Sequence, residues 1–257
     1  MTTLSPAEWH RRFLIQAGWT ETLRRHLFQR AHVETFPRIL EVGCGTGAIL
    51  ASIESREMVE PRQTLVGVDI RASLLAAAAQ QTARALLARA EGGRLPFADN
   101  TFNLAFCHFF LLWVEQPVKY IEEMKRVVKP GGHVMALAEP DYGGRIDYPD
   151  ELKQLGVWQQ DALRRQGADP LIGRRLSACF HQAGLVQVET GLLSGRWSGN
   201  HPLGEWESEW EIIAADLAGD VDSFTLERLR ATDHRAWESG ERVLFVPTFY
   251  AWGQKPE

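Results

Sequence analysis

Cysteine is scarce in this chain of 257 residues. The three cysteines, Cys44, Cys107 and Cys179, stand far apart and form neither a metal-ligand spacing nor a disulfide framework. The N-terminus also lacks the basic start and apolar core of a secretory signal. We therefore expect no metal site, and a cytoplasmic location in which thiols stay reduced.

Long apolar runs and basic tracts are missing as well. No run approaches the roughly 18 uninterrupted apolar residues of a transmembrane helix, so we expect no membrane association. Lysine and arginine total 28 against 33 acidic residues, a net charge of −5, and cluster only in short pairs such as Arg11-Arg12. Because a nucleic-acid backbone demands a basic stripe, we expect no nucleic-acid partner. With 45% hydrophobic and 24% charged residues, the composition is that of an ordinary globular domain.

Glycine, by contrast, is concentrated in residues 39–50. A short apolar run there ends in Gly43, Gly45 and Gly47 and passes into a helix-like segment. Glycine lets backbone approach a ligand closely, and the new helix N-terminus aims free N–H groups at it. Asp69 closes the next apolar run, where a carboxylate can hold a ribose diol. The pattern predicts a nucleoside-cofactor site, and a G-x-G-x-x-A spacing within it also leaves NAD open.

Further motifs follow this turn in a fixed order. Glu41 stands two residues before the first glycine and gives E-x-G-x-G-x-G. Glu91 is followed by Leu95-Pro-Phe97, and later Val127-Val-Lys-Pro-Gly-Gly132 leads into another apolar run. In this order, over about residues 36–140, the chain resembles the class I S-adenosylmethionine (SAM) dependent methyltransferases. The resemblance is to the small-molecule branch that includes ubiquinone- and menaquinone-type enzymes, methyltransferase type 11.

Apolar runs alternate with helical patterns along the chain, which predicts an α/β fold. The resemblance implies a Rossmann-like, doubly wound, mostly parallel seven-stranded sheet with an antiparallel last strand, plus helical cap elements. The expected strands are 38–42, 64–69, 102–108, 133–139, 185–192 and 243–253. The expected helices are one or two within 6–32, then 47–57, 72–90, 116–128, 150–166, 173–183, 204–218 and 224–238.

We expect residues 1–257 to form a single methyltransferase domain. Residues 1–35 would be an N-terminal helical lid and residues 36–140 the SAM-binding core. Residues 141–216 would supply substrate-cap insertions.

The resemblance also assigns roles to residues of the cofactor site. Glu41 matches the acid that hydrogen-bonds the methionine amine, and Asp69 the acid that binds both ribose hydroxyls, while Ile70 would pack on the adenine face. Glu91 stands where related enzymes usually place Asp to accept from the adenine amino group, a task that the Gly92 N–H could take over. The full set of expected cofactor contacts is Glu41, Gly43, Cys44, Gly45, Gly47, Asp69, Ile70, Glu91, Gly92 and His108.

Catalysis itself asks little of the protein, because the sulfonium of SAM already activates the methyl group for in-line displacement. The protein must hold a nucleophile about 3–3.5 Å away and aligned, and a general base is optional. We expect His108, Asp141 and Tyr142 to act on the acceptor, at the ends of neighbouring strands. The expected reaction is methyl transfer to O or N of a small-molecule acceptor, by a chain that can form a homodimer.

Two other functions remain open from the sequence. A non-catalytic SAM- or partner-binding protein of this fold is compatible with two departures from the family pattern, Glu91 and Asn103. An NAD(P)-dependent oxidoreductase is disfavoured because no Tyr-x-x-x-Lys signature is present.

Tryptophan is abundant, with nine residues. An aromatic-lined pocket would favour a planar or cationic acceptor. The helical spacing of Trp206 and Trp210 instead predicts core packing for these two. The tryptophans in segments expected to surround the site are Trp9, Trp19, Trp113, Trp158, Trp197, Trp206 and Trp210.

Overall fold

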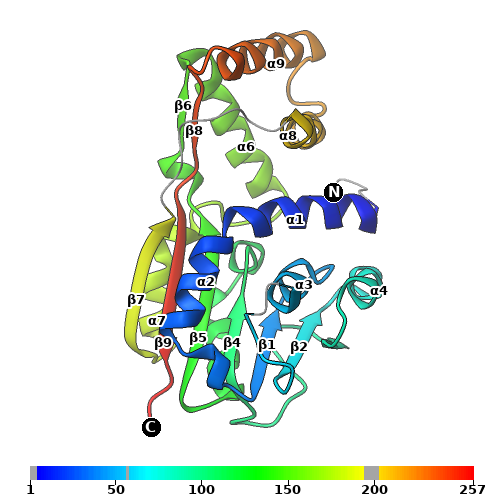
Figure 1. The fold of residues 1–257 in the computed structure, drawn as a ribbon. Coiled ribbons are helices and arrows are strands. Elements are labelled where there is room, and N and C mark those ends of the chain that lie inside the picture. The colour runs from blue at the N-terminus through cyan, green and yellow to red at the C-terminus, as the bar shows by residue number, and fades with distance from the viewer. Residues whose placement is uncertain (1–4, 56–57, 194–202) are drawn as a thin grey trace.

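A seven-stranded sheet in the order β3-β2-β1-β4-β5-β9-β7 forms the centre of the molecule (Figure 1). The computed structural model describes residues 5–55, 58–193 and 203–257. Only β9 runs antiparallel to its neighbours, so the predicted sheet is confirmed. The strands are β1 (Arg38–Val42), β2 (Thr64–Asp69), β3 (Leu86–Arg89), β4 (Phe102–Cys107), β5 (Val128–Pro140), β7 (Val186–Leu193) and β9 (Thr248–Gln254).

Helices cover both faces of the sheet because its strands are apolar on both sides. In β4, Leu104 and Phe106 enter one hydrophobic cluster, whereas Ala105 and Cys107 enter the other. The first cluster is covered by α1 (Pro6–Trp19), α2 (Glu21–Arg30), α3 (Ala48–Ser55) and α4 (Ala72–Gln81). The second is covered by α5 (Pro117–Val127) and α7 (Leu176–Gln182). This two-sided burial is typical of a doubly wound parallel sheet.

Local sequence signals fix where the first helix begins. Ser5 is the N-cap of α1, and its hydroxyl accepts from the Glu8 N–H while the Glu8 carboxylate accepts from the Ser5 N–H. Pro6 occupies the first helical position, where its missing N–H has no cost. This capping box holds the start of the expected lid segment in helical form.

The expected helix over 72–90 is wrong in its second half. Helix α4 ends at Gln81, and Thr82 takes an extended conformation. The segment Leu86–Arg89 is then paired with Val66–Asp69 of β2 as the edge strand β3. The run of alanines and leucines has high helix propensity throughout, but ladder hydrogen bonds to β2 outweigh that preference in the last four residues.

The expected last strand over 243–253 is broken at Pro247. Its first part, β8 (Val243–Phe245), pairs with β6 (Ile146–Tyr148). No strand was expected at the position of β6. Its second part is β9 of the main sheet. Proline has no N–H to donate to a ladder, so the chain changes sheets at this residue.

A cap of helices lies beyond the carboxyl ends of the parallel strands, with α1 between the cap and the sheet (Figure 1). Its own hydrophobic cluster joins α6 (Lys153–Arg165), α8 (Leu203–Asp216) and α9 (Ser223–Glu238). Trp206 and Trp210 are buried there, which confirms their core role. The cluster includes α9 and so extends past the expected limit at residue 216, while residues 194–202, with Trp197, lie outside the described part of the chain.

In the part of the chain that the structure describes, five short 3₁₀ helices lie between these elements. They are η1 (Val33–Thr35), η2 (Leu111–Trp113), η3 (Tyr142–Gly144), η4 (Asp150–Leu152) and η5 (Ile172–Arg175). Among the described residues, no helix is long and apolar enough to cross a bilayer. Nor does any group of three or more His, Cys, Asp or Glu in these residues have a geometry that could hold a metal ion.

Candidate functional site

The turn after β1 adopts a backbone conformation that favours glycine. Gly43, Gly45 and Gly47 have φ of +75°, +52° and +76°, in the left-handed region that other residues rarely adopt. A Cβ on Gly43 would lie 2.3 Å from Phe110 Cδ2, which is a severe clash. The turn therefore presents bare backbone at the carboxyl end of β1.

Cys44 contributes to this turn through its backbone. Its N–H and that of Gly43 both donate to the Val68 carbonyl at 2.9 Å. The thiol lies in the core, where a Cβ on Gly67 would be 2.9 Å from its Sγ, and burial raises the pKa of Cys44 far above its usual value. The expected cofactor contact of Cys44 therefore stays a prediction for its main chain alone.

Asp69, at the end of β2, anchors the glycine turn. Its Oδ2 accepts from the Gly45 N–H at 2.9 Å, and its Oδ1 accepts from the Arg71 N–H at 2.8 Å. Each oxygen keeps a second lone pair, so the carboxylate can still bind two hydroxyls. Beside it Ile70 is 56% exposed, an apolar surface with room for a planar ring. The Arg71 guanidinium lies 5.6 Å from the Trp9 ring of α1, so the first helix closes over this edge of the site.

Glu41 on β1 carries a buried oxygen without a protein partner. The residue is 2% exposed, and its Oε2 has no hydrogen bond to any described residue. Burial raises the pKa of Glu41 to about 8, against the opposing attraction of the Arg24 guanidinium. Buried polar atoms are nearly always hydrogen-bonded, so this oxygen is available to a hydrogen-bond donor of a ligand.

Two hydrogen bonds hold Glu91, which lies in the loop after β3. Its Oε1 accepts from the Gly93 N–H at 2.9 Å, and the Tyr120 hydroxyl of α5 also donates to the carboxylate, which raises the pKa of Tyr120 to about 12. The Phe110 ring lies against Gly92, where a Cβ would be 3.0 Å from its Cζ. Sequence reasoning missed Tyr120 and Phe110, because nothing in their local pattern links α5 and η2 to this loop.

His108 stands at the carboxyl end of β4 beside the first helices. Its Nε2 lies 2.8 Å from Thr20 Oγ1. Burial and the nearby Arg24 guanidinium lower the pKa of His108 to about 3, so the imidazole is neutral at physiological pH. The next residue, Phe109, has φ of +47°, a strained conformation for an aromatic residue, which marks this segment as a candidate functional site.

Glu139, at the end of β5, holds the segment that follows His108. Its carboxylate accepts from the N–H groups of Phe110, Leu111 and Leu112 at 2.8 to 3.1 Å. Burial raises the pKa of Glu139 to about 7, although these three donors favour the charged form. Glu139 was not among the site residues expected from the sequence, because contacts between the ends of β4 and β5 leave no local pattern.

Asp141 is engaged in the protein rather than free for a ligand. It accepts from Arg174 Nε at 2.5 Å and Nη2 at 2.7 Å, and from the Gly143 N–H at 3.0 Å. Its catalytic role stays a prediction, and this bidentate pair makes anchoring of the loop after β5 the simpler interpretation.

Tyr142 lies between the core and the cap. Burial raises its pKa, and its charged neighbours come from several elements: Arg12 on α1, Arg145 before β6, and Glu209 and Asp216 on α8. Its hydroxyl has no hydrogen bond to another described residue, and the raised pKa keeps it protonated. Tyr142 is thus a neutral donor at the place where lid, cap and core meet.

Helix α1 rests directly on the glycine turn, as a lid would. His10 Nδ1 lies 2.8 Å from Thr46 Oγ1, and Phe13 Cε2 would be 2.8 Å from a Cβ on Gly45. Residues 1–35 as a lid remain a prediction, and these contacts are the ones that opening would break.

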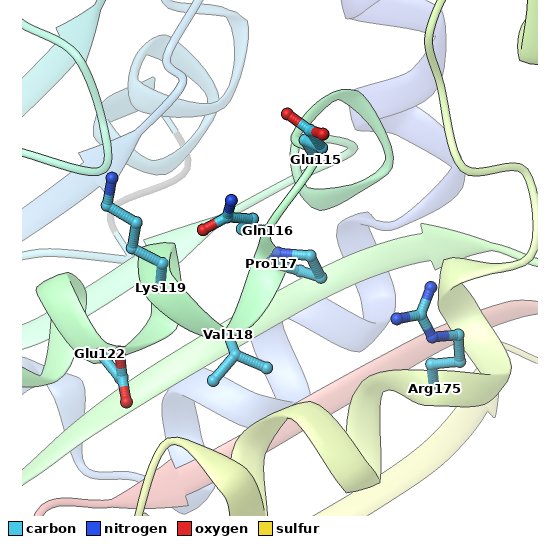
Figure 2. A pocket seen from close by; sticks show the side chains of 7 residues that line it. All are labelled: Glu115, Gln116, Pro117, Val118, Lys119, Glu122 and Arg175. Atoms are coloured by element: carbon cyan, nitrogen blue, oxygen red, sulfur yellow. The ribbon is translucent and has the colours of Figure 1, made fainter.

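A hollow of about 410 Å³ lies elsewhere, at the start of α5 (Figure 2). It is lined by residues 115–119, Glu122 and Arg175, none of which belongs to the cofactor motifs. The charges around it are of both signs, and Arg175 is paired with Asp169 at 2.5 Å. We therefore assign the hollow no ligand.

Taken together, the sheet order, the glycine turn and Asp69 define a Rossmann-like protein with a nucleoside-cofactor site at its strand ends. A family model described as a methyltransferase domain matches residues 40–136. An uncharacterized methyltransferase of Schizosaccharomyces pombe is 32% identical over 80% of this chain and 79% of its own length. A demethylmenaquinone methyltransferase of Lactiplantibacillus plantarum is 26% identical over 69% of this chain and 72% of its own.

Solved structures show the same fold. A putative methyltransferase from Bacillus halodurans aligns with a TM-score of 0.58 at 13% identity, over 90% of this chain and 98% of its own. A Haemonchus contortus phosphoethanolamine N-methyltransferase, solved with S-adenosylhomocysteine (SAH), aligns with a TM-score of 0.57 at 17% identity, over 87% of this chain and 50% of its own.

The chain belongs to the class I SAM-dependent methyltransferases. Like the methyltransferases that it matches, it is an enzyme. Its cofactor is SAM, which decides between the two cofactors that the glycine spacing left open. The site fits this cofactor. Glu41 Oε2 has no hydrogen-bond partner among the described residues, Asp69 has lone pairs for a diol, and Ile70 has an exposed apolar face.

Removing the Tyr120 hydroxyl tests the Glu91 position. In Tyr120→Phe the Glu91 carboxylate loses one donor, and we expect SAH affinity to fall by about twofold to tenfold, the value of one net hydrogen bond. Calorimetric titration measures the change. Unchanged affinity would show that Glu91 needs no support from α5 to serve the cofactor.

Proposed function

We propose that this enzyme transfers the methyl group of SAM to O or N of a small-molecule acceptor by direct in-line displacement. The observation that carries the proposal is the cap of helices over the strand ends, with α1 between the cap and the sheet (Figure 1). The hydroxyl of Tyr142 lies in that region among charges from α1 and α8. Strand ends covered in this way favour a small acceptor over a macromolecule.

We assign the cofactor contacts residue by residue. The Glu41 carboxylate would bind the methionine ammonium, Asp69 the ribose hydroxyls, Ile70 the adenine face, and Glu91 or the Gly92 N–H the adenine edge. Gly43, Gly45 and Gly47 allow the close approach of the backbone. When bound, SAM supplies a methyl group already activated by its sulfonium.

The protein residues then have to orient the acceptor. His108 is neutral with a low pKa and so is a weak base, Asp141 is paired with Arg174, and Tyr142 stays protonated. We therefore propose that His108 and Tyr142 position the acceptor through hydrogen bonds and that Asp141 holds the loop after β5. The acceptor supplies its own nucleophilic lone pair, and any proton that it loses goes to solvent. Such alignment is worth several powers of ten in rate without proton transfer by the enzyme.

Location and assembly belong to the same proposal. The three cysteines are unpaired and buried, which supports a cytoplasmic enzyme. We keep the homodimer as a prediction that sedimentation analysis can test.

Transfer of a ¹³C-methyl group tests the proposal. The enzyme is incubated with ¹³C-methyl SAM and small amine and hydroxyl acceptors, then with a metabolite extract, and separately with demethylmenaquinone, whose conversion to menaquinone would place the label on carbon. We expect label in a small product, with the ¹³C shift of an O- or N-methyl group, and none with the Asp69→Ala variant. Label on carbon would overturn the assignment to O or N, and label in protein or nucleic acid would overturn the small-molecule acceptor.

The raised pKa of Glu41 leads us to expect proton release when SAM binds. With a pKa of about 8 in the ligand-free protein, its carboxyl is mostly protonated at pH 7, and the ammonium of SAM favours the charged form. Calorimetry in buffers of different ionisation enthalpy should therefore detect release of up to about one proton at pH 7, fading above pH 8, where the carboxyl is already ionised. In Glu41→Gln we expect no such release and an affinity at least about tenfold lower. Equal proton release in both proteins would remove Glu41 from the ammonium site.

A further inference from the structure

A continuous chain of hydrogen bonds runs from a buried arginine to His108. Arg24, on α2, is fully buried, and its Nη1 donates to Thr20 Oγ1 at 3.0 Å. Thr20, between α1 and α2, is 1% exposed, and its Oγ1 lies 2.8 Å from His108 Nε2. The chain joins the lid helices to the end of β4, and sequence reasoning found none of its links.

Counting donors and comparing distances favours one direction for the last link. A guanidinium can only donate, so Thr20 Oγ1 accepts from Arg24 and has one proton of its own to give. That proton has three acceptors within reach: Ala17 O at 3.3 Å, Gln16 O at 3.5 Å and His108 Nε2 at 2.8 Å. If the hydroxyl donates to Nε2, its proton lies in the shortest of the three contacts; if an Nε2–H donates to Oγ1 instead, the hydroxyl proton is left with a carbonyl at 3.3 Å or more, so the first arrangement is favoured. Ala17 O also receives Arg24 Nη1 at 3.2 Å, so it has less need of the hydroxyl proton.

The neutral state of the ring completes the argument. Burial and the positive charge of Arg24 both disfavour the imidazolium, and the pKa of His108 is lowered accordingly. A neutral ring whose Nε2 accepts must carry its proton on Nδ1. The Nδ1 atom has no hydrogen bond to another described residue, and the side chain is partly exposed at the carboxyl end of β4.

We propose that Thr20 and Arg24 are positioning residues that fix His108 as the Nδ1–H tautomer, so that its ring donates a hydrogen bond to an oxygen of the ligand instead of accepting a proton from it. The inference rests on the proposed function for the identity of that ligand. The oxygen belongs either to the carboxylate of SAM or to the methyl acceptor.

Nitrogen NMR on ¹⁵N-histidine-labelled enzyme tests the tautomer directly and needs no acceptor. The His108 resonances are identified by their loss in His108→Asn. We expect a protonated Nδ1 and an unprotonated Nε2 from pH 6 to 8, and in Thr20→Val, which keeps the shape but cannot donate, a shift toward the Nε2–H form. Thr20→Ser restores the hydroxyl and should restore the Nδ1–H form. An Nε2–H tautomer or an imidazolium in the wild-type enzyme would overturn the proposal.

Binding and turnover distinguish the two oxygens. Thr20→Val and His108→Gln, which lacks a donor at the Nδ1 position, should each lower either SAH affinity or kcat/KM by about threefold to tenfold. In His108→Asn the amide nitrogen replaces Nδ1, so this variant should keep most of the wild-type value. If the oxygen is that of SAM, SAH affinity falls; if it is that of the acceptor, SAH affinity holds and kcat/KM falls. Equal losses in His108→Asn and His108→Gln would contradict the donor role. Failure to find methyl transfer with any acceptor would count against the proposed function and leave the NMR result intact.

Discussion

The Asp69→Ala variant is expected to lose SAM affinity by about 100-fold or more. Hydrogen bonds to charged groups contribute about 1.5–3 kcal/mol each, and the carboxylate has a free lone pair for each of two ribose hydroxyls. The variant also releases the Gly45 N–H, which Asp69 Oδ2 holds at 2.9 Å, so the glycine turn loses its anchor to β2. Since about 1.4 kcal/mol corresponds to tenfold, losing either hydroxyl contact together with the anchor accounts for this factor.

Two control variants separate charge from shape and from global damage. Asp69→Asn keeps one acceptor oxygen for the Gly45 N–H but removes the charge, and we expect an intermediate affinity. Asp161→Ala removes an exposed aspartate of α6 whose ion pair is with Arg164 of the same helix, and we expect wild-type affinity. Wild-type SAM affinity in Asp69→Ala, with an unchanged unfolding temperature, would refute the ribose assignment.

The Asp233→Ala variant is expected to destabilise the cap by about 3–5 kcal/mol, the cost of removing one partner from a buried ion pair. Asp233 Oδ2 accepts from the indole N–H groups of Trp206 and Trp210 at 2.6 and 2.9 Å, and its Oδ1 accepts from Arg242 Nε at 2.5 Å. Arg242 also donates to Asp147 at 2.8 Å, so the aspartate connects α8 and α9 to β6 and β8. Truncation leaves two indoles and part of a buried guanidinium without acceptors.

Urea unfolding followed by tryptophan fluorescence measures this loss, because the cap cluster holds Trp158, Trp206, Trp210 and Trp237 of the nine tryptophans. Asp233→Asn keeps an acceptor and should cost less than the alanine variant. Asp222→Ala, which removes only the exposed N-cap of α9, should cost about 0.5–2 kcal/mol. A loss below about 1 kcal/mol in Asp233→Ala would show that the network does not hold the cap together.

The sequence predicted the parts of the site that lie next to one another along the chain. The glycine turn, Glu41 and Asp69 form a short motif with a physical purpose at each position, so their place at the strand ends and the parallel sheet could be foreseen. Their roles toward the cofactor stay predictions. Sequence periodicity placed β1, β2 and β4 to within one residue, because their apolar runs are bounded by turns.

The missed features depend on contacts between distant segments. Strand β3 shares its composition with α4, and only pairing with β2 makes it a strand. Tyr120 and Thr20 were overlooked because each meets its partner, Glu91 or His108, from an element far along the chain. Asp141 was expected to serve catalysis because of its place after β5, and Arg174, which engages it, lies 33 residues further on.

Calorimetric titration of the wild-type enzyme and of Asp69→Ala with SAM, SAH and NAD tests the central claim most directly. We predict that SAM and SAH bind the wild-type enzyme at one saturable site, that Asp69→Ala loses this binding, and that NAD binds neither protein. Binding of NAD, or SAM affinity that survives the loss of Asp69, would contradict the SAM site built on the glycine turn.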